Sequence, residues 1–178
     1  MSQAIVVMGV SGSGKSTIGT LLAAAIPGAV FIDADDLHPA ANKTMMAAGI
    51  PLTDQDREPW LHTCAVTVAA ERAAGRPVVL ACSALRRRYR DLLTAGAGPL
   101  HFVHLRAGTE LLTDRLTARQ GHFMPAGLLN SQLETLEELE PDETGIVVDV
   151  HAAPAEVVQR LLARWDRRQP SASLPPGA

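Results

Sequence analysis

Residues 4–16 read AIVVMGVSGSGKS, an apolar run followed at once by a glycine-rich loop that ends in lysine and serine. The apolar run predicts a buried strand, and Ile18, Leu21 and Leu22 recur at helical spacing after the loop. Between a strand and a helix, such a loop turns backbone N–H groups toward phosphates, and the helix N-terminus adds a favourable dipole. The stretch therefore predicts a P-loop that holds a nucleoside triphosphate.

The side chains of this loop have separate expected roles. Lys15 supplies a mobile cation for the β and γ phosphates, and the Ser16 hydroxyl is suited to bind Mg²⁺. The residues expected to bind the nucleotide are Gly9, Ser11, Gly12, Ser13, Gly14, Lys15, Ser16 and Thr17.

The composition limits the classes of protein that fit. The chain has 178 residues, 47% of them hydrophobic, which suits one domain over residues 1–168 followed by a disordered tail at 169–178. A formal charge of −3 argues against a nucleic-acid partner. No apolar run approaches the roughly 18 residues that cross a bilayer, and Cys64 and Cys82 lie in apolar settings typical of reduced thiols. These features predict a cytoplasmic protein with no membrane partner.

Five short apolar runs alternate with longer helical patterns. The runs lie at residues 5–8, 29–32, 78–81, 101–105 and 146–150, and the helical patterns at 16–25, 58–74, 84–95, 110–119, 128–139 and 154–167. This alternation predicts an α/β fold with a parallel five-stranded sheet and helices on both faces. Two segments, about 34–60 and about 115–126, fit the alternation badly, and in a phosphoryl-transfer enzyme they suit an acceptor-binding insert and a closing lid.

Acidic residues follow the second predicted strand, where residues 33–36 read DADD. At the carboxyl edge of the sheet, Asp35 is expected to orient the acceptor hydroxyl and take its proton, or to help hold Mg²⁺ through water. The alternative is that these carboxylates only cap the next helix. The third strand is followed by Ser83 and not by an acid, so Mg²⁺ must rely on Ser16, the phosphates, water and Asp33 or Asp35. The missing acid favours a kinase over a motor or switch protein.

Several longer motifs carry a resemblance to a known family. They are GVSGSGKST at 9–17, DADDLHP at 33–39, GIPLTDQDREPWL at 49–61, CSALR at 82–86, YRD at 89–91, HFMP at 122–125 and SQ at 131–132. Together these motifs closely resemble the gluconokinase family over nearly the whole chain up to the tail. The resemblance implies a P-loop NTPase of adenylate-kinase-like fold with a lid, usually dimeric. The implied reaction transfers the γ-phosphoryl group of ATP to the 6-hydroxyl of D-gluconate. The chain differs from the family pattern at Ala34, usually Gly, and at Met45, usually Lys.

A linear polyol with one carboxylate needs a cation and several hydrogen-bonding groups. Arg57 and Arg86 are the candidates for the carboxylate, because arginine offers a bidentate fork. The candidates for the hydroxyls are His38, Asp54, Tyr89, His122 and Gln132, besides Asp35. Each has a plainer alternative: Arg57 pairs with Asp54 or Asp56, Tyr89 is a core residue, and His38 and His122 are ordinary loop histidines. Arg87, Arg88 and Arg90 are expected to form a solvated face.

The segment before the predicted lid carries Arg115 and Arg119 one helical turn apart. Facing the nucleotide, they would neutralise charge on the transferring phosphoryl group, which makes the predicted catalytic set Lys15, Asp35, Arg115 and Arg119. The alternative for Arg115 is an exposed pair with Glu110 or Asp114. Two other functions stay open: a kinase of the same fold acting on shikimate or a nucleoside monophosphate, and a nucleotide-dependent switch that contacts nucleic acid through residues 86–90.

Overall fold

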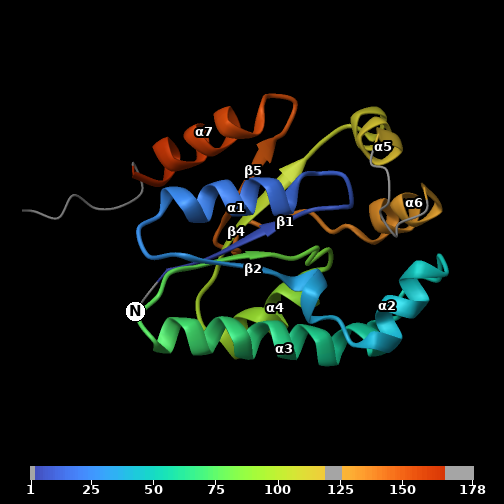
Figure 1. The fold of residues 1–178 in the computed structure, drawn as a ribbon, viewed down its shortest axis with the longest axis horizontal. Helices are drawn as coiled ribbons and strands as arrows, with labels where there is room; N and C mark the ends of the chain where they lie inside the picture. The colour runs from blue at the N-terminus through green and yellow to red at the C-terminus, as the bar shows by residue number, and fades with distance from the viewer. Residues whose placement is uncertain (1–2, 119–125, 167–178) are drawn as a thin grey trace, which may run out of the picture.

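A five-stranded parallel sheet of order β2-β3-β1-β4-β5 forms the centre of the computed structural model, which describes residues 3–118 and 126–166 (Figure 1). The strands are β1 (Ala4–Met8), β2 (Val30–Asp33), β3 (Val78–Ala81), β4 (His101–Arg106) and β5 (Gly145–Asp149). Each matches a predicted apolar run to within one or two residues. The prediction of a parallel five-stranded sheet is confirmed.

Helices cover both faces of this sheet, as the alternation predicts. They are α1 (Lys15–Ala25), α2 (Ala40–Ala47), α3 (Asp54–Ala73), α4 (Arg87–Ala97), α5 (Thr109–Ala118), α6 (Ala126–Thr135) and α7 (Pro154–Asp166). α1 and α7 pack on one face with Ile5 and Val7, and α3 and α4 pack on the other with Val6 and Met8 (Figure 1). Alternate residues of β1 thus point to opposite layers of the core. None of the described helices is long and apolar enough to cross a membrane.

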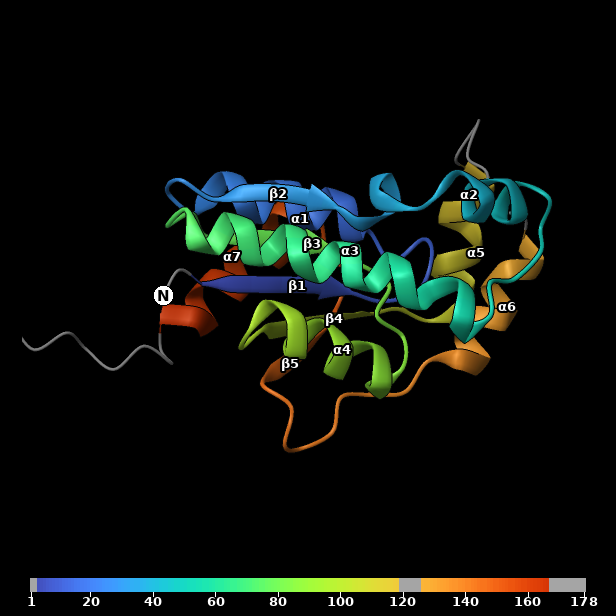
Figure 2. The ribbon, with the colours of Figure 1, turned by 90° about the horizontal axis from the view of Figure 1, so that it is seen from below.

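The segment predicted as an insert contains secondary structure that the alternation did not predict. A 3₁₀ helix, η1 (Ala34–Leu37), follows β2 directly, and α2 comes next. α2, α5 and α6 lie together beyond the carboxyl end of the sheet, where both views place them side by side (Figures 1 and 2). The carboxyl end of the sheet is therefore enclosed by short helices from distant parts of the chain.

Three predicted helix boundaries are wrong, each for a local reason. α3 begins at Asp54 and not at residue 58, because Thr53 and Asp56 form a capping box. α4 begins at Arg87 and not at residue 84, because Ala84 adopts a left-handed φ of 43° that a helix does not allow. α6 ends at Thr135, four residues before the predicted end, because the Glu137 N–H leaves the helical pattern and donates to the Leu85 carbonyl in the loop after β3 at 2.8 Å.

Candidate active site

The glycine-rich loop between β1 and α1 has the backbone shape that phosphate binding needs. Gly9 and Gly14 have backbone φ values of 143° and 94°, which residues other than glycine rarely adopt. A Cβ at Gly9 would lie 2.8 Å from the carbonyl oxygen of Leu105, so no larger residue fits there. The Lys15 ammonium donates to the Val10 carbonyl at 3.1 Å and thus stays folded over the loop.

The first acid after β2 contacts the loop. Ser16 Oγ donates to Asp33 Oδ2 at 2.6 Å, and Asp33 Oδ1 accepts from the backbone N–H of Asp35 at 3.1 Å. β3 lies between β1 and β2, so the two strands are not neighbours, yet α1 brings Ser16 back to the end of β2. A hydroxyl and a carboxylate are the hard oxygen donors that Mg²⁺ prefers. Within the described ranges, no cluster of three or more His, Cys, Asp or Glu side chains could hold a metal by itself.

A pocket beside the loop brings several of the predicted site residues together. Its polar lining comes from Ser11, Lys15, Asp35, His38, Arg57, Ser83, Ser131 and Gln132. Its apolar lining comes from Met46, Ile50, Pro51, Leu52 and Trp60. One wall thus belongs to the phosphate loop and the opposite wall to the segment between β2 and α3. Such a pocket suits a small polar molecule held next to a phosphate.

Trp60 joins α3 to the segment after β2. Its indole N–H donates to the Ala34 carbonyl at 2.7 Å, and the His38 ring stacks on it with centroids 4.0 Å apart and planes 12° apart. Trp60 and His38 are both buried. Burial, together with the positive charges of Arg57 and Lys43, lowers the pKa of His38 to about 4. At neutral pH His38 is therefore an uncharged ring in the pocket wall, one that hydrogen-bonds without adding charge.

His38 predicts a measurable pH dependence of stability. Its pKa is about 6.5 in the unfolded chain and about 4 in the folded one, so the unfolded state binds the proton more readily. The contribution of uncharged His38 to the free energy of unfolding is therefore complete above about pH 6.5 and is lost as the pH falls toward 4. Between pH 7 and pH 4.5 we expect the free energy of unfolding, measured in urea, to fall by about 2 kcal/mol more for the wild type than for His38→Gln. Equal losses in the two proteins would contradict this assignment.

Asp54, Arg86 and Tyr89 form a separate cluster behind the pocket and are not among its lining residues. Asp54 accepts from Arg86 at 3.0 Å, from Arg88 at 2.7 Å and from the Tyr89 hydroxyl. The Tyr89 bond, with the arginines, holds the pKa of Asp54 below its ordinary value. The cluster thus satisfies the polar groups of these residues internally.

Arg57 connects this cluster to the pocket. Its guanidinium carbon lies 5.6 Å from the centroid of the Tyr89 ring, and it also lines the pocket. Its Nε is buried and has no hydrogen-bond partner among the described residues. Asp56, which the sequence offered as a partner for Arg57, instead bonds to Thr53 in the capping box. Arg57 is therefore a cation that lies against an aromatic face and lines the pocket.

Arg115 lies on the other side of the phosphate loop. It donates to the Val150 carbonyl at 2.7 Å and to the Gly12 carbonyl at 3.5 Å. It borders a cavity of about 390 Å³ lined also by Gly12, Ser13, Gly14, Thr17, Ile18, Ala118, Val150, Ala152, Pro154 and Val157. No ion pair with Glu110 or Asp114 occurs in the part of the chain that the structure describes. The cavity is large enough for part of a nucleoside and is separate from the pocket that Lys15 lines.

Two predicted residues, Arg119 and His122, lie outside the described residues, as do most of the predicted lid and the tail at 169–178. One prediction for the arginines after β3 is wrong. Arg90 does not belong to a solvated face, since its side chain is 1% exposed and pairs with Glu143. Helical periodicity places Arg90 and Leu93 on one face of α4, and this spacing was the available sign of burial.

The pocket also contains residues that sequence reasoning missed. Ser83 and Ser131 supply hydroxyls, and Met46, Ile50 and Leu52 supply an apolar wall. The sequence carried no sign of a site at the apolar positions, because isolated apolar residues in a polar segment are ordinary. Their role depends on how the segment folds back over the sheet.

Comparisons with known proteins show which family and fold this chain resembles. A family model described as an AAA domain matches residues 5–139. A gluconokinase from Gluconobacter oxydans is 48% identical over 161 residues, which cover 90% of each chain. The crystal structure of a sugar kinase from Janibacter superposes with a TM-score of 0.89 at 47% identity, covering 93% of this chain and 95% of the other. That of a gluconokinase from Sinorhizobium meliloti superposes with a TM-score of 0.80 at 48% identity, covering 93% and 92%.

Proposed function

This chain belongs to the gluconokinase family, and from that premise we propose that it transfers the γ-phosphoryl group of ATP to the 6-hydroxyl of D-gluconate. The observation that carries the proposal is the pocket in which Lys15, Asp35 and Arg57 share one lining. A phosphate-binding cation, a carboxylate base and a second cation are what the transfer to an anionic polyol needs.

The donor half of the site is the phosphate loop with the cavity behind it. We propose that the backbone N–H groups of residues 12–17 and the Lys15 ammonium bind the β and γ phosphates of ATP. The cavity bordered by Arg115, Pro154 and Val157 would take part of the nucleoside. Arg115, held by carbonyl oxygens on both sides, suits a fixed wall of the nucleoside site better than a group that moves onto the γ phosphate.

Mg²⁺ fits the same half of the site. Ser16 and Asp33 would hold it, because their oxygens already share one hydrogen bond of 2.6 Å beside the loop. When bound, the ion would neutralise charge on the phosphate oxygens during transfer. The Asp33 carboxylate also accepts the N–H of Asp35, so the metal-binding residue and the proposed base are held by one another.

The acceptor half of the site is the pocket between the loop and α3. We propose that Arg57 binds the D-gluconate carboxylate, and that His38 and Gln132 bind its hydroxyls. Asp35 orients the 6-hydroxyl toward the γ phosphate and takes its proton as the new P–O bond forms. The γ-phosphoryl group passes directly from ATP to the acceptor oxygen, the bond to the β–γ bridging oxygen breaks, and ADP leaves, with no intermediate on the protein. Asp54, Arg86 and Tyr89 would act behind this site by holding Arg57.

The deciding experiment is a screen of phosphoryl acceptors with purified protein, ATP and Mg²⁺, in which ADP release is measured. D-gluconate should support turnover and give a product heavier by one phosphoryl group, with the phosphate on carbon 6 by ³¹P NMR. Shikimate and AMP should give no turnover above the rate without acceptor. Turnover with either of these and not with D-gluconate would overturn the proposal.

Three further features belong to the same proposal. Arg119, proposed from its helical spacing with Arg115, and His122, which belongs to the family motif at 122–125, would complete the lid over ATP and acceptor. A homodimer follows from the resemblance to the family, and light scattering on the purified protein measures it. A cytoplasmic location is consistent with ATP as donor and with Cys64 and Cys82 as free thiols.

A further inference from the structure

We infer that Arg90 is a positioning residue for the proposed reaction, acting from the far side of α4 on residues of the pocket. The inference rests on the proposed function, because it concerns how the acceptor site is held. Arg90 does not line the pocket. Its guanidinium joins the loop after β3, which contributes Ser83 to the pocket, to the segment that directly follows α6, the helix that contributes Ser131 and Gln132.

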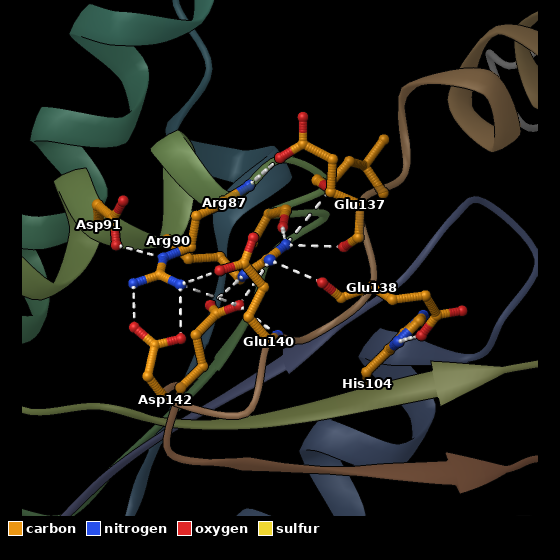
Figure 3. A network of polar contacts seen from close by, with 11 residues as sticks. Arg87, Arg90, Asp91, His104, Glu137, Glu138, Glu140 and Asp142 are labelled. Atoms are coloured by element: carbon orange, nitrogen blue, oxygen red, sulfur yellow. Dashed lines mark hydrogen bonds and ion pairs between the residues drawn. The ribbon is translucent and has the colours of Figure 1, made fainter.

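The Arg90 side chain is the centre of a buried polar network (Figure 3). It is 1% exposed, and the Glu143 carboxylate that faces it is 5% exposed. Nε donates to one oxygen of Glu143 at 2.5 Å, and Nη2 donates to the other at 2.8 Å. Burial disfavours the charge on Glu143, yet the bonds from Arg90 and from the Glu140 N–H hold its pKa below the ordinary value. The pair is therefore charged on both sides.

The same guanidinium also reaches backbone carbonyls of two distant segments. Nη1 donates to Ala84 and Leu85 in the loop after β3, each at 3.3 Å. Nη1 and Nη2 donate to Glu137 and Glu138 after α6, at 3.0 and 3.2 Å. The backbone adds its own bond here, because the Glu137 N–H donates to the Leu85 carbonyl at 2.8 Å. Arg90 thus fastens the segment after α6 to the loop after β3.

Each fastened segment leads directly to the phosphate loop. Ser83, next to Ala84, lines the pocket, and its carbonyl accepts the Gly9 N–H at 3.3 Å. Gln132, on the last turns of α6, accepts the Ser11 N–H through its side-chain oxygen at 2.7 Å. A shift of either segment would move a pocket residue relative to the phosphates. Small misplacements of substrate-positioning groups are costly to rate.

Stability alone is a weak explanation for this network. A buried ion pair is often no more stabilising than apolar residues of the same volume, since both charges lose their hydration. Arg90 instead fixes the relative position of two segments. Its planar guanidinium donates hydrogen bonds at the same time to the Glu143 carboxylate and to backbone carbonyls of both segments. Lysine keeps the charge but has no such planar group.

Arg87, on the same helix, offers a matched control. Its side chain pairs at 2.8–2.9 Å with Asp91, Glu140 and Asp142, which are more than half exposed (Figure 3), and lies only at 3.9 Å from the buried Glu143. It therefore contacts the segment after α6 mainly through surface carboxylates, with a longer contact to Glu143. Surface pairs of this kind contribute little to stability. Arg87→Lys changes an arginine of α4 but keeps the bonds from Arg90 to the carbonyls of Ala84, Leu85, Glu137 and Glu138.

The test compares Arg90→Lys with Arg87→Lys in ATP and D-gluconate assays, at a temperature where thermal unfolding shows both variants folded. We expect kcat/KM for D-gluconate to fall about 30-fold for Arg90→Lys and less than about twofold for Arg87→Lys. The Kd of a non-hydrolysable ATP analogue should change less than about twofold in both, because residues 12–17 and Arg115 lie apart from the fastening. Equal effects of the two variants would overturn the inference.

A double-mutant cycle with Gln132→Ala separates positioning from stability. If Arg90 acts by placing Gln132, then adding Arg90→Lys to Gln132→Ala should cost only about a further twofold. Fully additive losses would overturn the inference. If Arg90→Lys does not fold, the exposed Glu137 is tested instead, because its carboxylate accepts the Arg87 N–H at 2.6 Å and so joins the segment after α6 to the start of α4, next to the loop after β3. Glu137→Ala should then lose about fivefold and behave non-additively with Gln132→Ala, and wild-type activity of Glu137→Ala would overturn the inference.

Failure of the proposed function has a different signature. If the wild-type protein does not phosphorylate D-gluconate, the proposed function is refuted. The positioning role of Arg90 can still be tested. The same cycle is then measured with whichever acceptor the wild type does phosphorylate, and the same outcomes decide it.

Discussion

Replacing Asp35 with asparagine is expected to lower kcat by about a thousandfold, a loss in the range that general-base catalysis contributes. Asparagine keeps the size of the side chain and can still hydrogen-bond the acceptor hydroxyl, but it cannot take the proton. Asp35 lines the pocket together with Lys15, so it faces the place where the phosphoryl group moves. The Kd of an ATP analogue should change less than about threefold, because the phosphate loop keeps all its groups.

Asp36 is the matched control for this variant. It is the neighbouring residue on η1 and does not line the pocket. Asp36→Asn removes the same charge from the same short helix, and we expect kcat within about threefold of the wild type. Near-normal turnover of Asp35→Asn, or an equal loss in both variants, would remove Asp35 from the role of base.

Replacing Arg57 with glutamine is expected to raise the KM for D-gluconate about a hundredfold while kcat changes only a few-fold. The carboxylate of the acceptor is bound equally in the ground and transition states, so its loss appears in KM. The magnitude corresponds to one strong charge-assisted contact. Arg57 lines the pocket, and its Nε has no hydrogen-bond partner among the described residues. The KM for ATP should stay within about twofold.

Arg86 tests this choice between the two predicted arginines. Arg86 is committed to Asp54 at 3.0 Å and does not line the pocket. We expect Arg86→Gln to raise the KM for D-gluconate less than about tenfold, through a loosened Asp54 and Tyr89. A larger KM effect for Arg86→Gln than for Arg57→Gln would mean that Arg86, not Arg57, binds the carboxylate.

The sheet and the phosphate loop could be predicted because their signals are local. Apolar runs such as residues 5–8 mark strands that are buried on both faces, and glycines at fixed offsets mark the loop. Helix ends were predicted less well. The capping box at Thr53 and the left-handed Ala84 override the apolar periodicity from which boundaries at 58 and 84 were drawn.

The sequence could suggest candidate residues for the acceptor site, but not which of them line the same pocket. Residue types suited to a polyol acid pointed equally to Arg57 and Arg86, and only the fold separates one that lines the pocket from one bound to Asp54. Arg90 was assigned to solvent because an arginine cluster in a sequence is usually exposed. Its partner, Glu143, lies 53 residues away, beyond the reach of any local pattern.

The fold class, the nucleotide loop and, through the longer motifs, the family can be read from the amino-acid sequence. These properties rest on the spacing of neighbouring residues, which apolar periodicity and glycine conformation encode directly. The packing of distant segments sets three further contacts: Asp33 bonds Ser16, Arg57 lines the pocket, and Arg90 joins the segment after α6 to the loop after β3. Those contacts depend on strand order and on how far each chain segment turns back over the sheet, and a pair distant in sequence meets only once the core between them is packed.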